Sequence, residues 1–170
     1  MTSITRRYRF SASHRLHSDA LSAVENERLY GKCNNPFGHG HDYILEVTAA
    51  GPVGQTNGLV LSRLRLDRLV EEKILRLFAN RNLNADIPEF SRLVPTTENL
   101  ALAIASRLEQ NWTKYLCDEP STGGSDGGAC SRLIRVQVQE TDRNGFEVLL
   151  PMSPDRAPCH LEVENVHAQS

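Results

Sequence analysis

The segment from Thr5 to Ser13 alternates between apolar and polar side chains. Its apolar positions are Tyr8, Phe10 and Ala12. A period of two is typical of a strand that buries one face. We therefore predict a first strand that ends at His14. A second strand is predicted from His39 through Thr48, where apolar side chains again recur.

A second pair of strands is predicted near the end of the regular pattern. Residues 133–140 and 146–150 are rich in alternating apolar positions, and a turn over 141–145 joins them. Asn144-Gly145 within that turn is a strong hairpin signal, because both residue types tolerate positive φ. We therefore expect an antiparallel hairpin here.

Two helices are predicted between the strand pairs. Ser62 is a good N-cap residue and opens the clearer helix, because apolar residues follow it at helical spacing up to Phe78. Thr97 is predicted to cap a second helix. The inner stripe of that helix is Leu100, Ala101, Ile104, Ala105 and Leu108.

The remaining segments carry loop signals. Residues 15–35 are irregular and polar, with a helical turn expected near Glu25–Leu29, and residues 80–88 are predicted as a loop. Residues 117–131 contain several glycines and small polar residues, which is typical of a flexible surface insertion. Residues 151–170 are predicted to be a poorly ordered tail.

The order strand, strand, helix, helix, strand, strand predicts the fold class. It is typical of an α+β domain with an antiparallel four-stranded sheet and two helices on one face. At 170 residues the chain has room for one domain, which we assign to residues 1–150.

Composition and charge limit the classes of molecule that we expect this protein to bind. The formal net charge is −2 and no block of basic residues occurs, which argues against nucleic acid or a membrane surface as a partner. Neither a secretory signal nor a membrane-length apolar run is present. The cysteines are few and irregularly spaced, which favours a reducing compartment over a disulfide framework. We therefore expect a cytoplasmic protein that acts on a small molecule.

The sequence Gly38-His39-Gly40-His41 places two imidazoles on one face of the predicted second strand. His14, at the end of the first strand, is the natural third donor. Three neutral imidazoles leave one position open on a tetrahedral ion, which is typical of catalytic zinc. A His-x-His pair by itself also occurs in proteins that bind no metal, and a lone histidine is commonly a core or surface residue. Further motifs decide between these interpretations.

Several such motifs accompany the histidines in order along the chain. They are Ser11-Ala12-Ser13-His14-Arg15-Leu16, Gly31-Lys32-Cys33-Asn34-Asn35-Pro36, Gly58-Leu59-Val60, Asn82-Leu83, Pro95-Thr96-Thr97-Glu98-Asn99 and Glu140-Thr141-Asp142. In these motifs the chain resembles the 6-pyruvoyl-tetrahydropterin synthase family, from about Phe10 to Val148. The spacing from Cys33 to His39 resembles that of the pyruvoyl branch. The related 6-carboxy-tetrahydropterin synthases usually have a shorter spacing between the matching residues.

The resemblance implies a tunnelling (T-) fold, zinc on His14, His39 and His41, and a homohexamer built as a dimer of trimers with active sites between subunits. It implies an enzyme, a carbon–oxygen lyase of tetrahydrobiopterin biosynthesis. The implied reaction converts 7,8-dihydroneopterin triphosphate to 6-pyruvoyl-tetrahydropterin with loss of triphosphate.

The resemblance also implies roles for other residues. Cys33 matches the family's proton-abstracting cysteine, and nearby positive charge from zinc and Lys32 would lower its pKa. Glu140 matches the family's pterin anchor, and Thr96, Thr97 and Glu98 match a segment that lines the same pocket. Without the resemblance, Cys33 would be read as a small buried hydrophobe and Glu140 as a solvated strand residue.

One departure from the family affects the predicted chemistry. Ala79 and Asn80 stand where the family has an Asp-His pair, and neither can shuttle a proton at neutral pH. Three hypotheses follow: the standard reaction at a reduced rate, an altered side-chain reaction such as 6-carboxytetrahydropterin formation or retro-aldol cleavage, or a non-catalytic oligomer that binds a pterin.

Overall fold

The computed structural model describes residues 2–117 and 130–151. Five strands are present in this part of the chain: β1 (Thr2–His14), β2 (His39–Gly51), β3 (Arg81–Asn82), β4 (Arg132–Thr141) and β5 (Asn144–Leu149). The α-helices are α1 (Ala23–Tyr30), α2 (Arg63–Val70), α3 (Arg76–Phe78), α4 (Leu83–Asp86) and α5 (Thr97–Leu116). A π-helical turn, η2 (Glu71–Leu75), joins α2 to α3, and two 3-10 turns are η1 (Gly31–Asn34) and η3 (Pro88–Ser91).

The strands form one sheet in the order β3-β1-β2-β4-β5. The pairs β1–β2, β2–β4 and β4–β5 are antiparallel, so the predicted α+β fold with an antiparallel sheet is confirmed. The sheet has one strand more than predicted, because β3 pairs in parallel with Ala12 and Ser13 of β1. Asn80 makes this possible: its φ of 59° turns the chain, and its N–H donates to the Ser11 carbonyl at 2.6 Å. Asparagine tolerates that left-handed conformation better than most residues.

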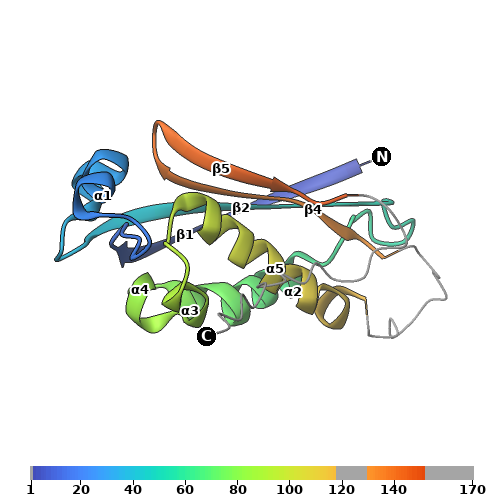
Figure 1. Cartoon of the computed structure of the whole chain (residues 1–170). Helices are drawn as coiled ribbons and strands as arrows, with labels where there is room; N and C mark the ends of the chain where they lie inside the picture. Colours follow the sequence, from blue (N-terminus) through green and yellow to red (C-terminus); the bar gives the residue numbers. More distant parts are fainter. Residues whose placement is uncertain (1, 118–129, 152–170) are drawn as a thin grey trace, which may run out of the picture.

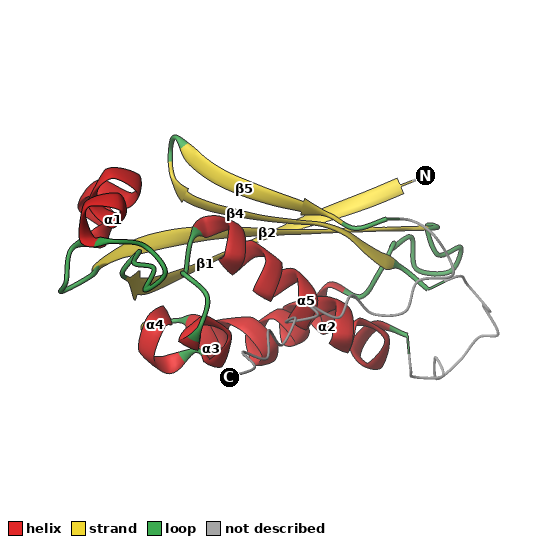
Figure 2. Cartoon of the chain, viewed as in Figure 1, coloured by secondary structure: helices red, strands yellow, loops and turns green. Residues whose placement is uncertain are grey.

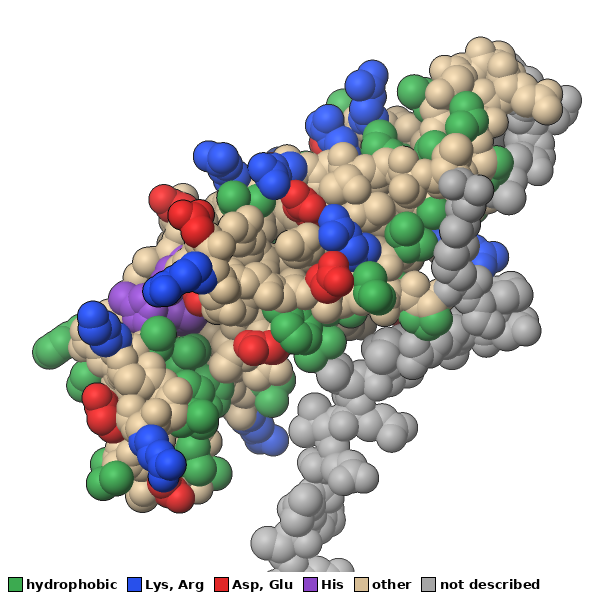
Figure 3. Space-filling view, turned by 90° about the horizontal axis from the view of Figure 1, so that it is seen from above, with side chains coloured by type: hydrophobic (Ala, Val, Ile, Leu, Met, Phe, Trp, Pro, Cys, Tyr) green, Lys and Arg blue, Asp and Glu red, His purple; other side chains and the backbone are tan. Residues whose placement is uncertain are grey.

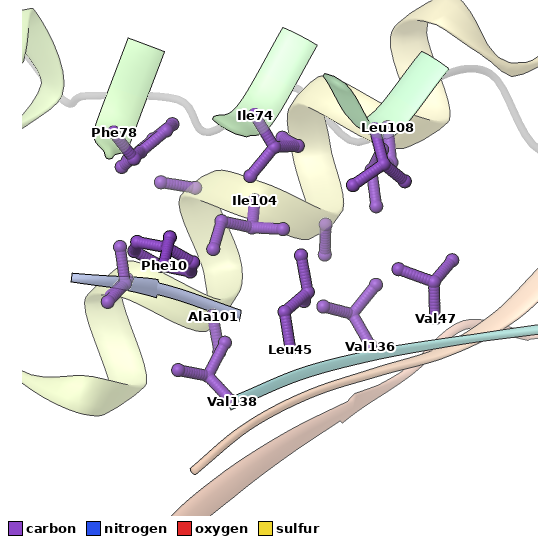
Figure 4. Close-up of a cluster of buried hydrophobic side chains, with 14 of the residues drawn as sticks. Phe10, Leu45, Val47, Ile74, Phe78, Ala101, Ile104, Leu108, Val136 and Val138 are labelled. Atoms are coloured by element: carbon purple, nitrogen blue, oxygen red, sulfur yellow. The ribbon is translucent and has the colours of Figure 1, made fainter. Parts of the chain in front are cut away.

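The helices α2, α3 and α5 lie together against one face of the sheet (Figures 1 and 2). The side chains between the two layers are fully or nearly fully buried, and Figure 4 shows them meeting across the interface. They include Phe10, Leu45, Val47, Val136 and Val138 from the strands, and Ile74, Phe78, Ala101, Ile104 and Leu108 from the helices. The alternation of apolar residues along β1, β2 and β4 thus selects the face that the helices cover.

The other face of the sheet, opposite α2, α3 and α5, carries charged side chains of both signs among scattered hydrophobic ones (Figure 3). Ion pairs cross its strands: Arg7 on β1 pairs with Glu46 on β2 at 2.8 Å, and Arg135 on β4 pairs with Glu46 at 2.8 Å and with Glu147 on β5 at 3.3 Å. Opposite charges on neighbouring strands support the register of the sheet.

Of the two predicted N-caps, the one of α2 is confirmed and the one of α5 is not. The Ser62 hydroxyl accepts from the Arg65 N–H at the start of α2, as predicted. The predicted cap at Thr97 is wrong, because the N-cap of α5 is Thr96, whose hydroxyl accepts from the Asn99 N–H at 3.3 Å. Either threonine could supply the hydroxyl, and the choice of Thr96 leaves the Thr97 hydroxyl free for a contact with the site.

Two turn predictions have different outcomes. The helical turn near Glu25 is confirmed and extends to the whole of α1, which begins with a capping box between Ser22 and Glu25. The turn between β4 and β5 is shorter than predicted. Asn144 and Gly145 already belong to β5, and the connecting residues are Asp142 and Arg143. The predicted insertion at 117–131 falls mainly outside the described residues, and the predicted tail at 151–170 does so after Pro151.

The cysteines depart from the expectation that their number and spacing favour a reducing compartment over a disulfide framework. Cys117, just after α5, and Cys130, just before β4, form a disulfide with a sequence separation of 13 residues. Cys33 is the free cysteine of the described residues. Cysteine count and spacing could not reveal this pair, because only the approach of the end of α5 to the start of β4 brings the two residues together. None of the helices in the described segments is both long and apolar enough to cross a membrane.

We predict that the Cys117–Cys130 disulfide stabilises the fold. Closing a loop of this size removes conformational entropy from the unfolded chain. This raises the free energy of unfolding by about 3 kcal/mol. Reduction should therefore lower the melting temperature by roughly 5–10 °C, measured by calorimetry with and without a reductant. A variant with Cys117→Ser and Cys130→Ser should melt at the lower temperature in both conditions. Equal melting temperatures for the oxidised and reduced wild-type protein would contradict the prediction.

Candidate metal and pterin site

The pairing of β1 with β2 brings three histidines to one end of the sheet. His14 lies directly opposite His39 in the antiparallel register, and Ala12 lies opposite His41. All three imidazoles project to the face that the helices cover. Their ring centroids lie 4.7 to 5.1 Å apart, and one ligand atom from each falls within 4.8 Å of the others. The predicted histidine trio is therefore assembled within a single chain.

The loop before α5 fixes the orientation of His14, which is only 1% exposed. Its Nδ1 lies 2.8 Å from the Pro95 carbonyl oxygen, which can only accept a hydrogen bond. Nδ1 therefore carries the proton, and Nε2 presents its lone pair to the other two histidines. A backbone carbonyl behind a ligating imidazole is a common device for fixing its tautomer.

The geometry and the protonation of the trio fit a metal ion. The Nε2 atoms of His14 and His39 lie 3.3 Å apart, which is about the separation of two ligands on a tetrahedral ion with bonds of about 2.0–2.1 Å. Two other buried ring nitrogens, His39 Nδ1 and His41 Nε2, have no hydrogen-bond partner among the described residues. Burial lowers the pKa of His14 and of His39. Both rings are thus kept neutral, as ligation requires.

Glu140 is the acidic group of this site, and a β-bulge places it there. The register between β4 and β5 shifts between Gln139 and Thr141, so Glu140 is the extra residue of β4. Its side chain is 11% exposed. The Oε1 atom lies 3.5 Å from His14 Nε2 and 3.6 Å from His41 Nε2. A carboxylate thus lies beside the histidines on the side that faces the N-terminus of α5.

Two residues that the sequence did not indicate hold this carboxylate. The hydroxyl of the fully buried Tyr43 donates to Glu140 Oε1 at 3.5 Å and lies 3.4 Å from His14 Nδ1. The amide of Asn144 donates to Glu140 Oε2 at 2.7 Å. Tyr43 resembled an ordinary core residue of the strand. Asn144 resembled a turn residue, so neither had a distinct sequence signal.

Cys33 lies in η1, half-buried, beside the segment that follows His14. Its carbonyl accepts from the Leu16 N–H at 2.8 Å. Burial raises the pKa of the Cys33 thiol, and the negative charge of Glu140 raises it further. The protein groups alone therefore do not produce the lowered pKa that we predicted for this thiol. A cation held by the histidines would act in the opposite direction, because it stabilises the thiolate.

The three predicted pocket residues at the start of α5 have different environments. The Thr97 side chain is buried, and its hydroxyl accepts from the Asn144 amide at 3.1 Å. The Thr96 hydroxyl is occupied by the helix cap. The Glu98 side chain is exposed and makes no hydrogen bond or ion pair within the described segments. Thr97 is thus the member of this segment that is connected to the site.

Ala79 and Asn80 lie on the connection between α3 and β3. Ala79 packs against the hydrophobic core, and the Asn80 N–H donates to the Ser11 carbonyl of β1. Asn80 lines a cavity of about 410 Å³ together with His41, Asp42 and Arg81. No carboxylate or imidazole occupies the positions of residues 79 and 80 to act on a proton.

Together these features define an α+β protein with a three-histidine cluster that could hold a metal ion, beside a largely buried carboxylate and a cysteine. The profile of the family described as 6-pyruvoyl tetrahydropterin synthase matches residues 3–149. The chain is 50% identical over 141 residues to the 6-pyruvoyl tetrahydrobiopterin synthase of Poecilia reticulata, covering 83% of this chain and 85% of that protein. The human enzyme of the same name is 45% identical over 141 residues, covering 83% and 86%.

A solved structure supports the same conclusion. The 6-pyruvoyl tetrahydropterin synthase of Caenorhabditis elegans superposes with a TM-score of 0.73 at 33% identity, covering 88% of this chain and 96% of that one. The chain therefore belongs to the 6-pyruvoyl tetrahydropterin synthase family, and its fold is that family's T-fold.

We predict that zinc binding depends on the histidine cluster. The wild-type protein, loaded with zinc and dialysed, should retain about one ion per chain, measured by mass spectrometry of the metal content. The His39→Ala variant should lose most of the zinc, because only two imidazoles then remain to hold the ion. His17→Ala is the matched control, since the His17 ring contacts Asn34 outside the cluster, and it should retain the metal. Equal retention by His39→Ala and wild type would contradict the assignment.

Proposed function

We propose that the chain is a zinc-dependent lyase that acts on the side chain of a dihydropterin. The proposed reaction converts 7,8-dihydroneopterin triphosphate to 6-pyruvoyl-tetrahydropterin with loss of triphosphate. The observation that carries the proposal is the convergence of three imidazoles with the Glu140 carboxylate and the Cys33 thiol at one end of the sheet, in a member of this family.

His14, His39 and His41 would hold the zinc ion. When bound, zinc supplies a Lewis acid that polarises oxygen atoms of the pterin side chain and makes the adjacent C–H bonds more acidic. The fixed tautomer of His14 keeps a lone pair directed at the ion. The neutral state of the buried rings means that no proton competes with the metal near neutral pH.

Glu140 would bind the pterin ring. A carboxylate accepts two parallel N–H bonds from the amino-pyrimidine edge of a pterin, and a largely buried carboxylate does so without competition from water. The hydrogen bonds from Tyr43 and Asn144 leave each carboxylate oxygen with remaining acceptor capacity. Thr97 lines the same region through its contact with Asn144. Thr96 and Glu98 are proposed to border the pocket from the first turn of α5.

A cavity next to the histidines offers positive charge for a phosphate chain. It measures about 500 Å³, and its lining includes the cationic Arg15 and Arg92, the anionic Asp19, and His17. The cavity lies beside Gly38, the residue that precedes His39. Guanidinium groups suit phosphate oxygens because they donate several hydrogen bonds in a fixed plane. This environment favours a phosphorylated dihydropterin over an uncharged one.

Cys33 is the proposed proton-abstracting group. Burial and the charge of Glu140 raise the pKa of this thiol, and a cation held by the histidines would favour its thiolate. The Ala79-Asn80 pair provides no second acid–base group, so we propose a slower reaction than in relatives that have the Asp-His pair. An altered cleavage that needs only the metal and one base is the alternative that this substitution favours.

We further propose that the chain assembles as a homohexamer in the cytoplasm, with active sites between subunits. Both edges of the sheet are available for pairing. β5 lies at one edge, and at the other edge β3 pairs with β1 only at Ala12 and Ser13. Unpaired strand edges favour sheet-to-sheet association. The sheet face that carries these ion pairs would then line the interior of a barrel.

The reaction is tested by incubating the zinc-loaded protein with 7,8-dihydroneopterin triphosphate and identifying the products by mass. We expect the 6-pyruvoyl product and free triphosphate. Cys33→Ala should lower the rate by roughly 100- to 10,000-fold, the usual contribution of a general base. Its zinc content should match that of the wild-type protein, which serves as the control for folding.

Other products would revise the proposal in defined ways. Loss of the whole side chain would support retro-aldol cleavage in place of elimination. A 6-carboxy product would support the chemistry of the related branch. Binding without turnover by the wild-type protein would contradict the proposal that this chain is a lyase.

A further inference from the structure

Asn144 connects the hairpin between β4 and β5 to the candidate site. Its side-chain amide donates to Glu140 Oε2 at 2.7 Å and to the Thr97 hydroxyl at 3.1 Å. The amide thus contacts the carboxylate on β4 and the first turn of α5 at the same time. Its two N–H groups are sufficient for these two acceptors.

The β-bulge explains how a residue at the start of β5 reaches Glu140. Gln139 pairs with Gly145, and Thr141 pairs with Asn144, so Glu140 has no cross-strand partner of its own. The Thr141 hydroxyl also accepts from the Asn144 N–H at 3.1 Å, which holds the backbone of the turn in place. Bulges commonly re-aim a side chain beside an active site. Here the bulge directs Glu140 and Asn144 toward each other.

The carboxylate is fixed at both oxygens. Asn144 holds Oε2, while the buried Tyr43 hydroxyl approaches Oε1. The bond from Asn144 is the shorter of the two, at 2.7 Å against 3.5 Å, and the acceptor is mostly shielded from water. Asn144 therefore makes the dominant contribution to the plane in which the carboxylate lies.

We propose that Asn144 is a positioning residue that sets the plane of Glu140 for recognition of a pterin ring. A carboxylate accepts two parallel N–H bonds from a flat ligand only when its own plane matches that of the ligand. Without the Asn144 amide, the carboxylate rotates about its terminal torsion, which is intrinsically broad. This inference rests on the proposed function, because it concerns the same site and the same class of ligand.

The experiment measures the affinity of the zinc-loaded protein for 7,8-dihydroneopterin by fluorescence titration. Asn144→Ala should raise the dissociation constant about 10- to 100-fold, the usual loss when a hydrogen bond to a charged group is removed. Asn144→Asp should lose at least as much, because it replaces a donor by a second negative charge next to Glu140. Arg143→Ala is the matched control in the same turn and should bind as the wild type does. Its side chain makes no hydrogen bond or ion pair in the part of the chain that the structure describes.

A double-mutant cycle separates positioning from direct contact or general damage to the fold. If Asn144 acts through Glu140, then Asn144→Ala should cost little further affinity in a Glu140→Gln background. Zinc content and melting temperature of each variant show whether the fold is retained. Additive losses in the double variant, or unchanged affinity in Asn144→Ala, would overturn the assignment of Asn144 alone. Failure of the wild-type protein to bind the pterin would instead overturn the proposed function, and this inference with it.

Discussion

The register of the β1–β2 pair determines both the hydrophobic core and the candidate site. It runs without a break from Thr2 opposite Gly51 to His14 opposite His39. Because side chains alternate between the two faces of a strand, a slip of one residue would move every inward side chain of β1 to the polar face. Burial of Phe10 and Tyr43 therefore fixes the same register that brings the imidazoles together. The site is stabilised by the packing of the sheet against α2, α3 and α5.

A cation would complete the electrostatics of the site. The His14 and His41 rings lie beside Glu140, and no Lys or Arg forms an ion pair with that carboxylate in residues 2–117 and 130–151. A largely buried carboxylate near neutral groups is costly unless hydrogen bonds or a nearby charge compensate for lost hydration. Tyr43 and Asn144 supply hydrogen bonds, and a metal ion on the histidines would supply the charge. The same ion would favour the thiolate of Cys33, which the protein groups disfavour.

The sequence allowed the main strands, the two long helices and the approach of the three histidines to one another to be predicted. Alternation and helical spacing are strong signals, because they follow from burial of one face. Short elements were missed because they depend on contacts between residues that are distant in the sequence. β3 depends on the left-handed conformation of Asn80 and on its bond to Ser11. The disulfide depends on the approach of two segments, the end of α5 and the start of β4. The bulge at Glu140 depends on how β4 and β5 pair. The contacts of Asn144 and Tyr43 follow from that tertiary arrangement and have no local signature.

The central claim is that His14, His39 and His41 hold one zinc ion with a position left open. X-ray absorption spectroscopy of the zinc-loaded protein tests this most directly. The account predicts three histidine nitrogens at about 2.0–2.1 Å and one further light atom in the coordination shell. A sulfur ligand at about 2.3 Å, which would indicate Cys33 in the shell, or fewer than three imidazoles would contradict it.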